Sequence, residues 1–174
     1  IMKKIIIIIT LLLSVKNYSQ GIIKLTILQD AKLGLIGDNK GNNAFTTDLL
    51  VKFKLTGKQF EYGYLTISPY LEYAEINGIY KRYAVDVGFT FNKLIIKNLE
   101  ITPSINYGIQ DRYKKSWLVF GADIEANYKL TDNIGLTALA QFVERKDLLW
   151  MYGDKKIRFS GFVGITINIF NTKK

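Results

Sequence analysis

Two carboxylates, Asp123 and Glu125, have the spacing that could support general acid–base chemistry. Residues two apart share one face of a β-strand, so one carboxyl could donate a proton while the other accepts one. The chain contains no histidine and no cysteine, which removes the commonest general base, the commonest transition-metal ligand and any Ser-His-Asp triad. We therefore predict no catalytic residue, no metal site and no cofactor, and a structural role for the two carboxylates.

The segment that carries this pair, residues 116–130, has an apolar side chain at every second position. This period of two predicts a β-strand with one apolar face and places the carboxylates on the opposite face. The apolar face is formed by Leu118, Phe120, Ala122, Ile124, Ala126, Tyr128 and Leu130.

The same alternation recurs along the chain and predicts eight strands. The predicted strands span about 23–36, 46–56, 60–75, 80–92, 98–110, 116–130, 133–146 and 156–170. Connections on one side are short, whereas most of those on the other side, such as 37–45 and 147–155, are longer. Short turns at one end and longer loops at the other are typical of bacterial outer-membrane barrels. Pro69 and Pro103 lie in mid-strand and lack a ladder donor, so we predict a local bulge at each.

Alternation alone does not decide which face of the sheet points outward. The mid-strand polar faces carry small, uncharged residues such as Thr66, Ser68, Thr102 and Ser104, which suit a narrow interior better than a solvated surface. We therefore predict an all-β fold, an eight-stranded antiparallel up-and-down transmembrane β-barrel with its apolar face toward lipid. The alternative is a soluble periplasmic lipid-binding, lipocalin-like barrel, which has the same period with its apolar face inside.

The N-terminus has the anatomy of a secretory signal peptide. Lys3 and Lys4 precede the apolar run 5–15, which is too short to span a bilayer. We predict a signal peptide over residues 1–20, with cleavage near Gln20, followed by one barrel domain over residues 21–174.

With these patterns in view, residues 21–174 resemble the small eight-stranded outer-membrane barrels of the OmpA/OmpX type. The isoleucine- and lysine-rich leader that ends in Tyr18, Ser19 and Gln20 looks like those of Bacteroidota. The resemblance implies a location in the outer membrane of a Gram-negative bacterium and insertion by the outer-membrane assembly machinery. That machinery reads an aromatic residue at the end of the last strand, for which Phe170 is the candidate.

Charged residues of both signs fall on the predicted inward faces. Buried charges are costly unless they are paired, so we predict ion pairs that fill an interior just wide enough for side chains. The predicted interior charges are Asp30, Lys32, Lys52, Lys54, Glu72, Asp86, Glu100, Asp123 and Glu125. A very narrow channel for small solutes remains the alternative.

The predicted external end is basic, in a chain whose net charge is +9. Clustered cations attract anionic partners, here the phosphates and acidic sugars of outer-leaflet lipopolysaccharide or an acidic surface protein partner. Nucleic acid is not expected at this location, and the chain has no recognisable binding motif for it. The predicted rim consists of Lys81, Arg82, Arg112, Lys114, Lys115, Arg145, Lys146, Lys155, Lys156 and Arg158. We therefore predict a structural, surface-interaction or lipopolysaccharide-contacting role.

Overall fold

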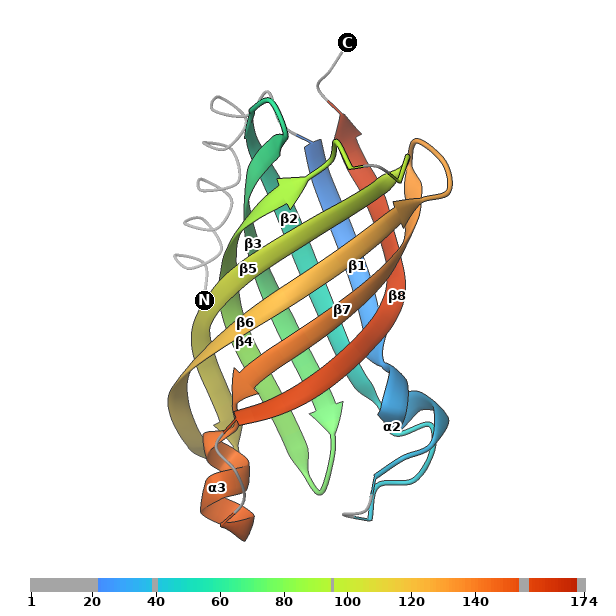
Figure 1. The fold of residues 1–174 in the computed structure, drawn as a ribbon. Helices are drawn as coiled ribbons and strands as arrows, with labels where there is room; N and C mark the ends of the chain where they lie inside the picture. Colours follow the sequence, from blue (N-terminus) through green and yellow to red (C-terminus); the bar gives the residue numbers. More distant parts are fainter. Residues whose placement is uncertain (1–21, 39–40, 95, 154–156, 172–174) are drawn as a thin grey trace, which may run out of the picture.

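The chain forms a closed antiparallel barrel of eight strands in the computed structural model, which describes residues 22–38, 41–94, 96–153 and 157–171 (Figure 1). Each strand pairs with its neighbours along the chain, and β1 pairs with β8 to close the barrel. The strands are β1 (Ile22–Asp30), β2 (Asp48–Gln59), β3 (Gly63–Glu75), β4 (Ile79–Phe91), β5 (Leu99–Arg112), β6 (Lys115–Lys129), β7 (Ile134–Glu144) and β8 (Ile157–Asn171). The predicted all-β, up-and-down architecture is confirmed, whereas the predicted signal peptide lies outside the described residues.

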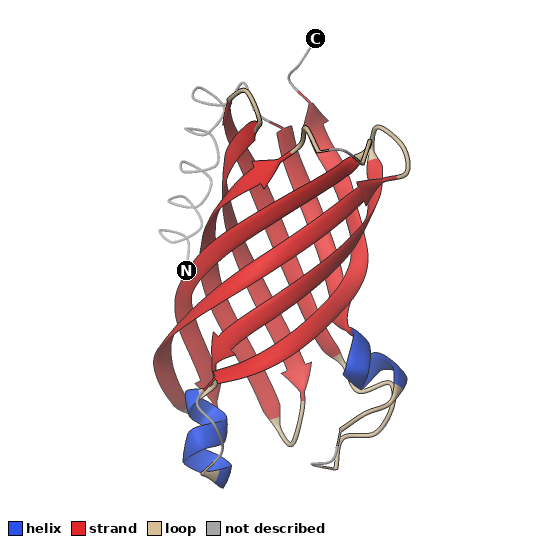
Figure 2. Cartoon of the chain, viewed as in Figure 1, coloured by secondary structure: helices blue, strands red, loops and turns tan. Residues whose placement is uncertain are grey.

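Two short helices, α2 (Ala31–Leu35) and α3 (Lys146–Tyr152), lie at the same end of the barrel (Figure 2). We call this end, which also holds the β3–β4 hairpin, the loop end. The opposite end holds the connections 60–62, 92–98 and 130–133 together with the start of β1 and the end of β8, and we call it the turn end (Figure 1). No helix among the described residues is long and apolar enough to cross a membrane.

The alternation of β6 separates an apolar exterior from a charged interior. Leu118, Phe120 and Ile124 are each more than half exposed, whereas Asp123 and Glu125 are only 2% and 1% exposed. Large apolar side chains cover the outside of the other strands in the same way, with Ile105 at 70% exposure. This sidedness is the one predicted for a transmembrane barrel and the opposite of that of a lipocalin-like barrel.

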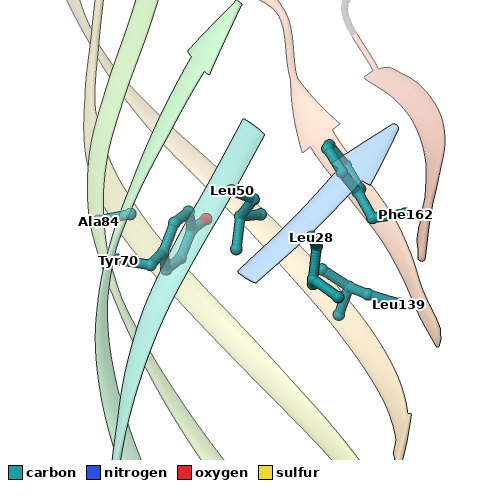
Figure 3. Packing of buried hydrophobic residues seen from close by; sticks show 6 residues of the cluster. All are labelled: Leu28, Leu50, Tyr70, Ala84, Leu139 and Phe162. Atoms are coloured by element: carbon teal, nitrogen blue, oxygen red, sulfur yellow. The ribbon is translucent and has the colours of Figure 1, made fainter. Parts of the chain in front are cut away.

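An apolar layer crosses the interior toward the loop end, a feature that the sequence analysis did not predict. It is formed by the buried side chains of Leu28, Leu50, Tyr70, Ala84, Leu139 and Phe162 (Figure 3). On β1 the inward residues run from Thr26 through Leu28 to Asp30, and on β2 they run from Lys52 through Leu50 to Asp48. On these two strands the layer therefore lies between the polar residues in the middle of the barrel and the aspartates at its loop end.

The two prolines cause no bulge, so that prediction was wrong. Pro69 pairs with Val85 and Pro103 pairs with Ile124, each in an unbroken register. The ladder from β2 to β3 passes from Lys52–Tyr70 to Leu55–Ile67 without changing register. Each proline ring points outward. The missing N–H group removes a ladder hydrogen bond to one of the two neighbouring strands only. The register shifts lie elsewhere, at Ile23/Lys24 and between Thr56 and Gln59.

β1 ends earlier than predicted because a helix begins there. The Asp30 carboxylate accepts a hydrogen bond from the Leu33 N–H group at 2.8 Å, which caps the first turn of α2. Leu33 then packs in a buried cluster with Ala74, Ile76 and Tyr80 of the β3–β4 hairpin region. The predicted strand 23–36 was therefore wrong beyond Asp30, and α2 covers part of the barrel mouth instead.

The seam between β1 and β8 joins the two ends of the described chain. Nine residues of β1, Ile22–Asp30, find partners on β8. Inside the barrel, the hydroxyl oxygens of Thr26 and Thr166 lie 2.7 Å apart although the residues are 140 positions apart in sequence. Thr166 also contacts the Thr137 hydroxyl at 2.6 Å, which ties the seam to β7.

Candidate functional site

Lys52 is the centre of a buried charge cluster in the middle of the barrel. Its Nζ lies 2.5 Å from Asp86 Oδ2, 3.5 Å from Glu125 Oε2 and 3.8 Å from Asp123 Oδ2. Lys54 Nζ lies 2.5 Å from Glu125 Oε1 on the same carboxylate. All five side chains are almost completely buried. The two carboxylates with the spacing for acid–base chemistry are therefore engaged by lysines in a closed interior.

A second cluster surrounds Glu100 toward the turn end. One carboxylate oxygen lies 2.5 Å from Lys24 Nζ, and the other lies 2.8 Å from Lys129 Nζ. The Tyr64 hydroxyl donates to the same carboxylate at 3.1 Å, and Asn127 donates to it at 3.3 Å. Glu100 thus has its negative charge balanced and its oxygens hydrogen bonded, which buried carboxylates require.

Arg82 projects inward from β4 on the loop-end side of the apolar layer, and its guanidinium reaches Asn106, which pairs with Asp86 of the central cluster. Its guanidinium is 3.6 Å from Glu72 Oε2, donates to the Asn106 side chain and stacks 5.3 Å from the centroid of the Tyr70 ring. The side chain is fully buried. Arg82 was predicted to be a rim cation, and this prediction was wrong because its inward position on β4 directs it into the barrel.

Asp147 joins two arginines at the mouth of the barrel. Arg112 Nη1 lies 2.8 Å from Asp147 Oδ2, and Arg145 donates from Nε and Nη2 at 2.9 Å each. Arg112 also donates to the backbone carbonyls of Ile76 and Asn77, and Arg145 lies 4.3 Å from the centroid of the Tyr80 ring. These contacts fix α3 and the β3–β4 hairpin over the loop end of the interior.

The electrostatics of this triad keep its members charged. Burial alone would raise the pKa of the Asp147 carboxyl, but the hydrogen bonds and charges of Arg145 and Arg112 outweigh it and hold that pKa at about 2. Burial alone would lower the pKa of the Arg145 guanidinium, but Tyr80 and Asp147 raise it above its usual value. The triad therefore stays ionised across the physiological range.

Of the nine predicted interior charges, Lys32 is the one that lies elsewhere. It is exposed on α2, because the chain leaves the barrel wall at Asp30. Asp30 is buried at the mouth as the helix cap, not as a member of a described ion pair. The structure brings the others together inside the barrel: Lys52, Lys54, Glu72, Asp86, Glu100, Asp123 and Glu125.

The predicted rim is smaller than the sequence indicated. Arg112 and Arg145 are buried in the Asp147 triad, so their assignment to an accessible rim was wrong. Lys114 and Lys115 are exposed, while Lys81, Lys146 and Arg158 are half-buried. Lys155 and Lys156 lie outside the described residues.

Aromatic residues accompany the lysines that remain at the rim. Lys115 Nζ lies 3.8 Å from the centroid of the Trp150 ring on α3, and that ring lies 6.1 Å from Trp117. Lys146 Nζ donates to the Leu118 carbonyl at 2.6 Å and lies 3.5 Å from Glu144. Sequence analysis found these lysines but not the helix that places Trp150 beside them.

The described residues contain no group of three or more Asp, Glu, His or Cys side chains arranged to hold a metal ion. No protein-family model matches the sequence, and no curated protein matches it. Among solved structures, the chain is similar to the crystal structure of Neisserial surface protein A. The two share 11% sequence identity with a TM-score of 0.46, over 87% of this chain and 98% of the other.

Proposed function

We propose that this protein is a non-enzymatic outer-membrane β-barrel of a Gram-negative bacterium, with a structural and surface-interaction role at its loop end. The observation that carries the proposal is the filled interior, in which ion pairs and an apolar layer occupy the space that a pore or a substrate would need. A barrel of eight strands is just wide enough for its own side chains to fill it.

The exterior supports a location in lipid. All eight strands carry exposed apolar side chains, such as Ile105, Phe120 and Leu136. If the protein were soluble, this apolar surface would face water around the whole barrel. A closed barrel also pairs its backbone N–H and C=O groups, as lipid requires.

The loop end faces the outside of the cell in this proposal, because barrels of this class have short periplasmic turns and longer external loops. The outward Phe170 at the end of β8 is the proposed signal for the assembly machinery.

Planar bilayers test the sealed interior directly. We expect the purified full-length protein to insert and to show no stable single-channel conductance, because side chains of the apolar layer and the Lys52 cluster occupy the narrow interior. Folding of the protein is checked separately by heat-modifiable migration on gels. Stable conductance of nanosiemens size would contradict the proposal and favour the narrow-channel alternative.

The exposed Lys114 and Lys115 and the half-buried Lys146, all at the loop end, are the proposed contacts for the phosphates of outer-leaflet lipopolysaccharide. Single exposed ion pairs contribute little, about 0–1 kcal/mol each. Trp150 and Tyr113 lie beside them and present large exposed rings of the kind found at membrane interfaces. An acidic surface protein is the other partner that this basic rim would suit.

Replacing these three lysines by glutamine should lower affinity for lipopolysaccharide about tenfold at low salt, since three weak contacts add to roughly 1–2 kcal/mol. The difference should shrink as salt is added, because screening acts over about 8 Å at physiological ionic strength. Binding is measured on the folded protein with lipopolysaccharide immobilised. The matched control replaces Lys58, Lys93 and Lys97, three exposed lysines at the turn end, with the same loss of charge. Equal losses in both variants would show that net charge, and not the rim, determines binding.

A further inference from the structure

The segment between β1 and β2 is fastened to the outer face of the barrel wall. Gln29 alternates with the buried Leu28 and Asp30, so its side chain points outward. The Gln29 side-chain amide donates to the Thr46 carbonyl at 3.0 Å, which holds the residues before β2 against this face. Gly34 of α2 lies against the same side chain, since a Cβ atom on Gly34 would be 3.3 Å from Gln29 Cγ. The end of α2 and the residues before β2 therefore meet on the outer side of the wall.

This outer part of the segment presents three large apolar side chains that the described residues leave uncovered. Leu35, Ile36 and Phe45 are 74%, 76% and 87% exposed. The Phe45 N–H donates to the Gly34 carbonyl at 3.3 Å, which places the third side chain beside the first two. The φ angle of Phe45 is +66°, a left-handed conformation that bulky residues rarely adopt. A strained residue whose ring gains no packing within the described chain indicates a contact outside it.

The apolar exterior of the barrel continues up to this segment. Val163 of β8 pairs with Gln29, and Phe159 lies further along β8 toward the loop end. Phe159 is itself 62% exposed and packs 5.1 Å from the ring of the outward Phe142 on β7. α2 contacts β8 as well as β1. The three side chains therefore extend the apolar outer surface of the wall and do not form a separate patch.

The charge of the segment favours lipid over a protein as the partner. Among residues 31–37 and 41–47, the one charged side chain is Lys32, which is exposed on α2. A lysine at a membrane surface keeps its apolar stem in the hydrocarbon boundary while its ammonium group reaches the phosphates. The centres of protein interfaces are instead depleted in lysine.

We propose that Leu35, Ile36 and Phe45 form an apolar anchor that inserts into the outer leaflet beside the β1–β8 seam. The inference rests on the proposed outer-membrane location. Apolar side chains at a membrane surface lie about 5–10 Å deep, at the boundary between headgroups and acyl chains. Because Gln29 holds the segment against the wall, the anchor is already in place when the barrel enters lipid. The connection between β1 and β2 then lies on the membrane and does not project freely into water.

Single spin labels test the position of the anchor, since the chain has no cysteine and each introduced cysteine is unique. The full-length protein is refolded into phosphatidylcholine nanodiscs as Leu35→Cys, Ile36→Cys or Phe45→Cys. Collisions of each label with oxygen, which concentrates in lipid, are compared with collisions with a water-soluble nickel chelate. We expect all three labels to collide mainly with oxygen, at a depth of about 5–10 Å below the phosphates. Ile124→Cys reports lipid contact on the barrel wall, and Lys114→Cys reports a water-exposed turn at the loop end.

The two reference labels separate failure of the anchor from failure of the proposed function. If the Ile124→Cys label lies in lipid while the three anchor labels collide mainly with the nickel chelate, the anchor is overturned and the membrane location stands. The exposed side chains would then be open to a protein partner. If the Ile124→Cys label also contacts water, the barrel is not in lipid, and the proposed location fails together with the anchor.

Ile36→Asp tests the anchor through its effect on the label at Phe45→Cys. Ile36 is exposed, so the substitution removes little internal packing, whereas a charge in the lipid boundary is unfavourable. The label should move from lipid into water, with a nickel collision rate that rises to that of Lys114→Cys. Asn43→Asp adds the same charge at an exposed polar residue of the segment and should leave the label in lipid. Heat-modifiable migration confirms that both variants fold. An unchanged label in Ile36→Asp, or an equal shift in Asn43→Asp, would overturn the anchor.

Discussion

Replacing Lys52 with methionine should lower the free energy of unfolding by about 3–5 kcal/mol, the cost of removing one partner from a buried ion pair. Lys52 is the cation nearest to Asp86, at 2.5 Å, and also contacts Asp123 and Glu125. Without Lys52, Lys54 still balances Glu125. Asp86 and Asp123, however, would lose the lysine that contacts both of them in the closed interior. Urea unfolding of the refolded protein, followed by tryptophan fluorescence, measures the loss.

Two comparisons make this result specific to charge. Lys58→Met, at an exposed position on β2, should leave the unfolding free energy within about 0.5 kcal/mol of the parent. Lys52→Met combined with Asp86→Leu should recover part of the stability, because apolar residues of similar size often replace buried ion pairs without cost. If Lys52→Met unfolds at the same urea concentration as the parent, the cluster does not depend on this lysine for charge balance.

Asp147→Asn should have an effect of similar size, about 3–5 kcal/mol, because it leaves two buried guanidinium groups without their shared carboxylate. The pKa of Asp147 is about 2 in the folded protein, below its ordinary value. A lowered pKa means that the carboxylate stabilises the fold at neutral pH and that this contribution is lost as the pH falls from about 4 toward 2. The parent should therefore lose stability over that interval, and the variant should show a flatter profile.

Unfolding free energies measured at a series of pH values check both parts of this expectation. Asp132→Asn, on the exposed β6–β7 turn, serves as the control and should follow the parent. A pH profile of Asp147→Asn that is as steep as that of the parent would assign the acid sensitivity to other carboxylates. Restoration of stability by an added salt would indicate that solvent ions reach the triad.

The alternation of the sequence predicted which residues face outward because the period of a strand is a local property of the chain. Ile124 and Asp123 are neighbours in sequence, and the strand alone places them on opposite faces. Lys32 was assigned wrongly because its position depends on a competing local signal, the Asp30 side chain that caps a helix. The pattern of apolar residues gave no reason to end the strand there, although aspartate before a short helix is a recognised cap.

The mouth of the barrel could not be predicted from the chain because its contacts join distant segments. Arg112 and Arg145 look like ordinary loop cations in the sequence, but β5 continues to Arg112 and directs it inward, and α3 brings Asp147 to both arginines. The apolar layer did leave a signal, since Leu28 and Leu50 interrupt otherwise polar inward faces. That signal is weak because single apolar residues on six strands form a layer only when the register of the sheet brings them to the same level.

The β1–β8 seam determines the order in which this barrel can assemble. Every other strand pair is a hairpin between chain neighbours, whereas Thr26 and Thr166 must meet across 140 positions of sequence. Contacts of such long range lose more chain entropy before they form and slow the folding of β-proteins. Until they form, β1 and β8 are open edges that can pair with other chains. Closure of the seam is therefore the expected slow step of folding, and the half-closed sheet is the species most prone to aggregate.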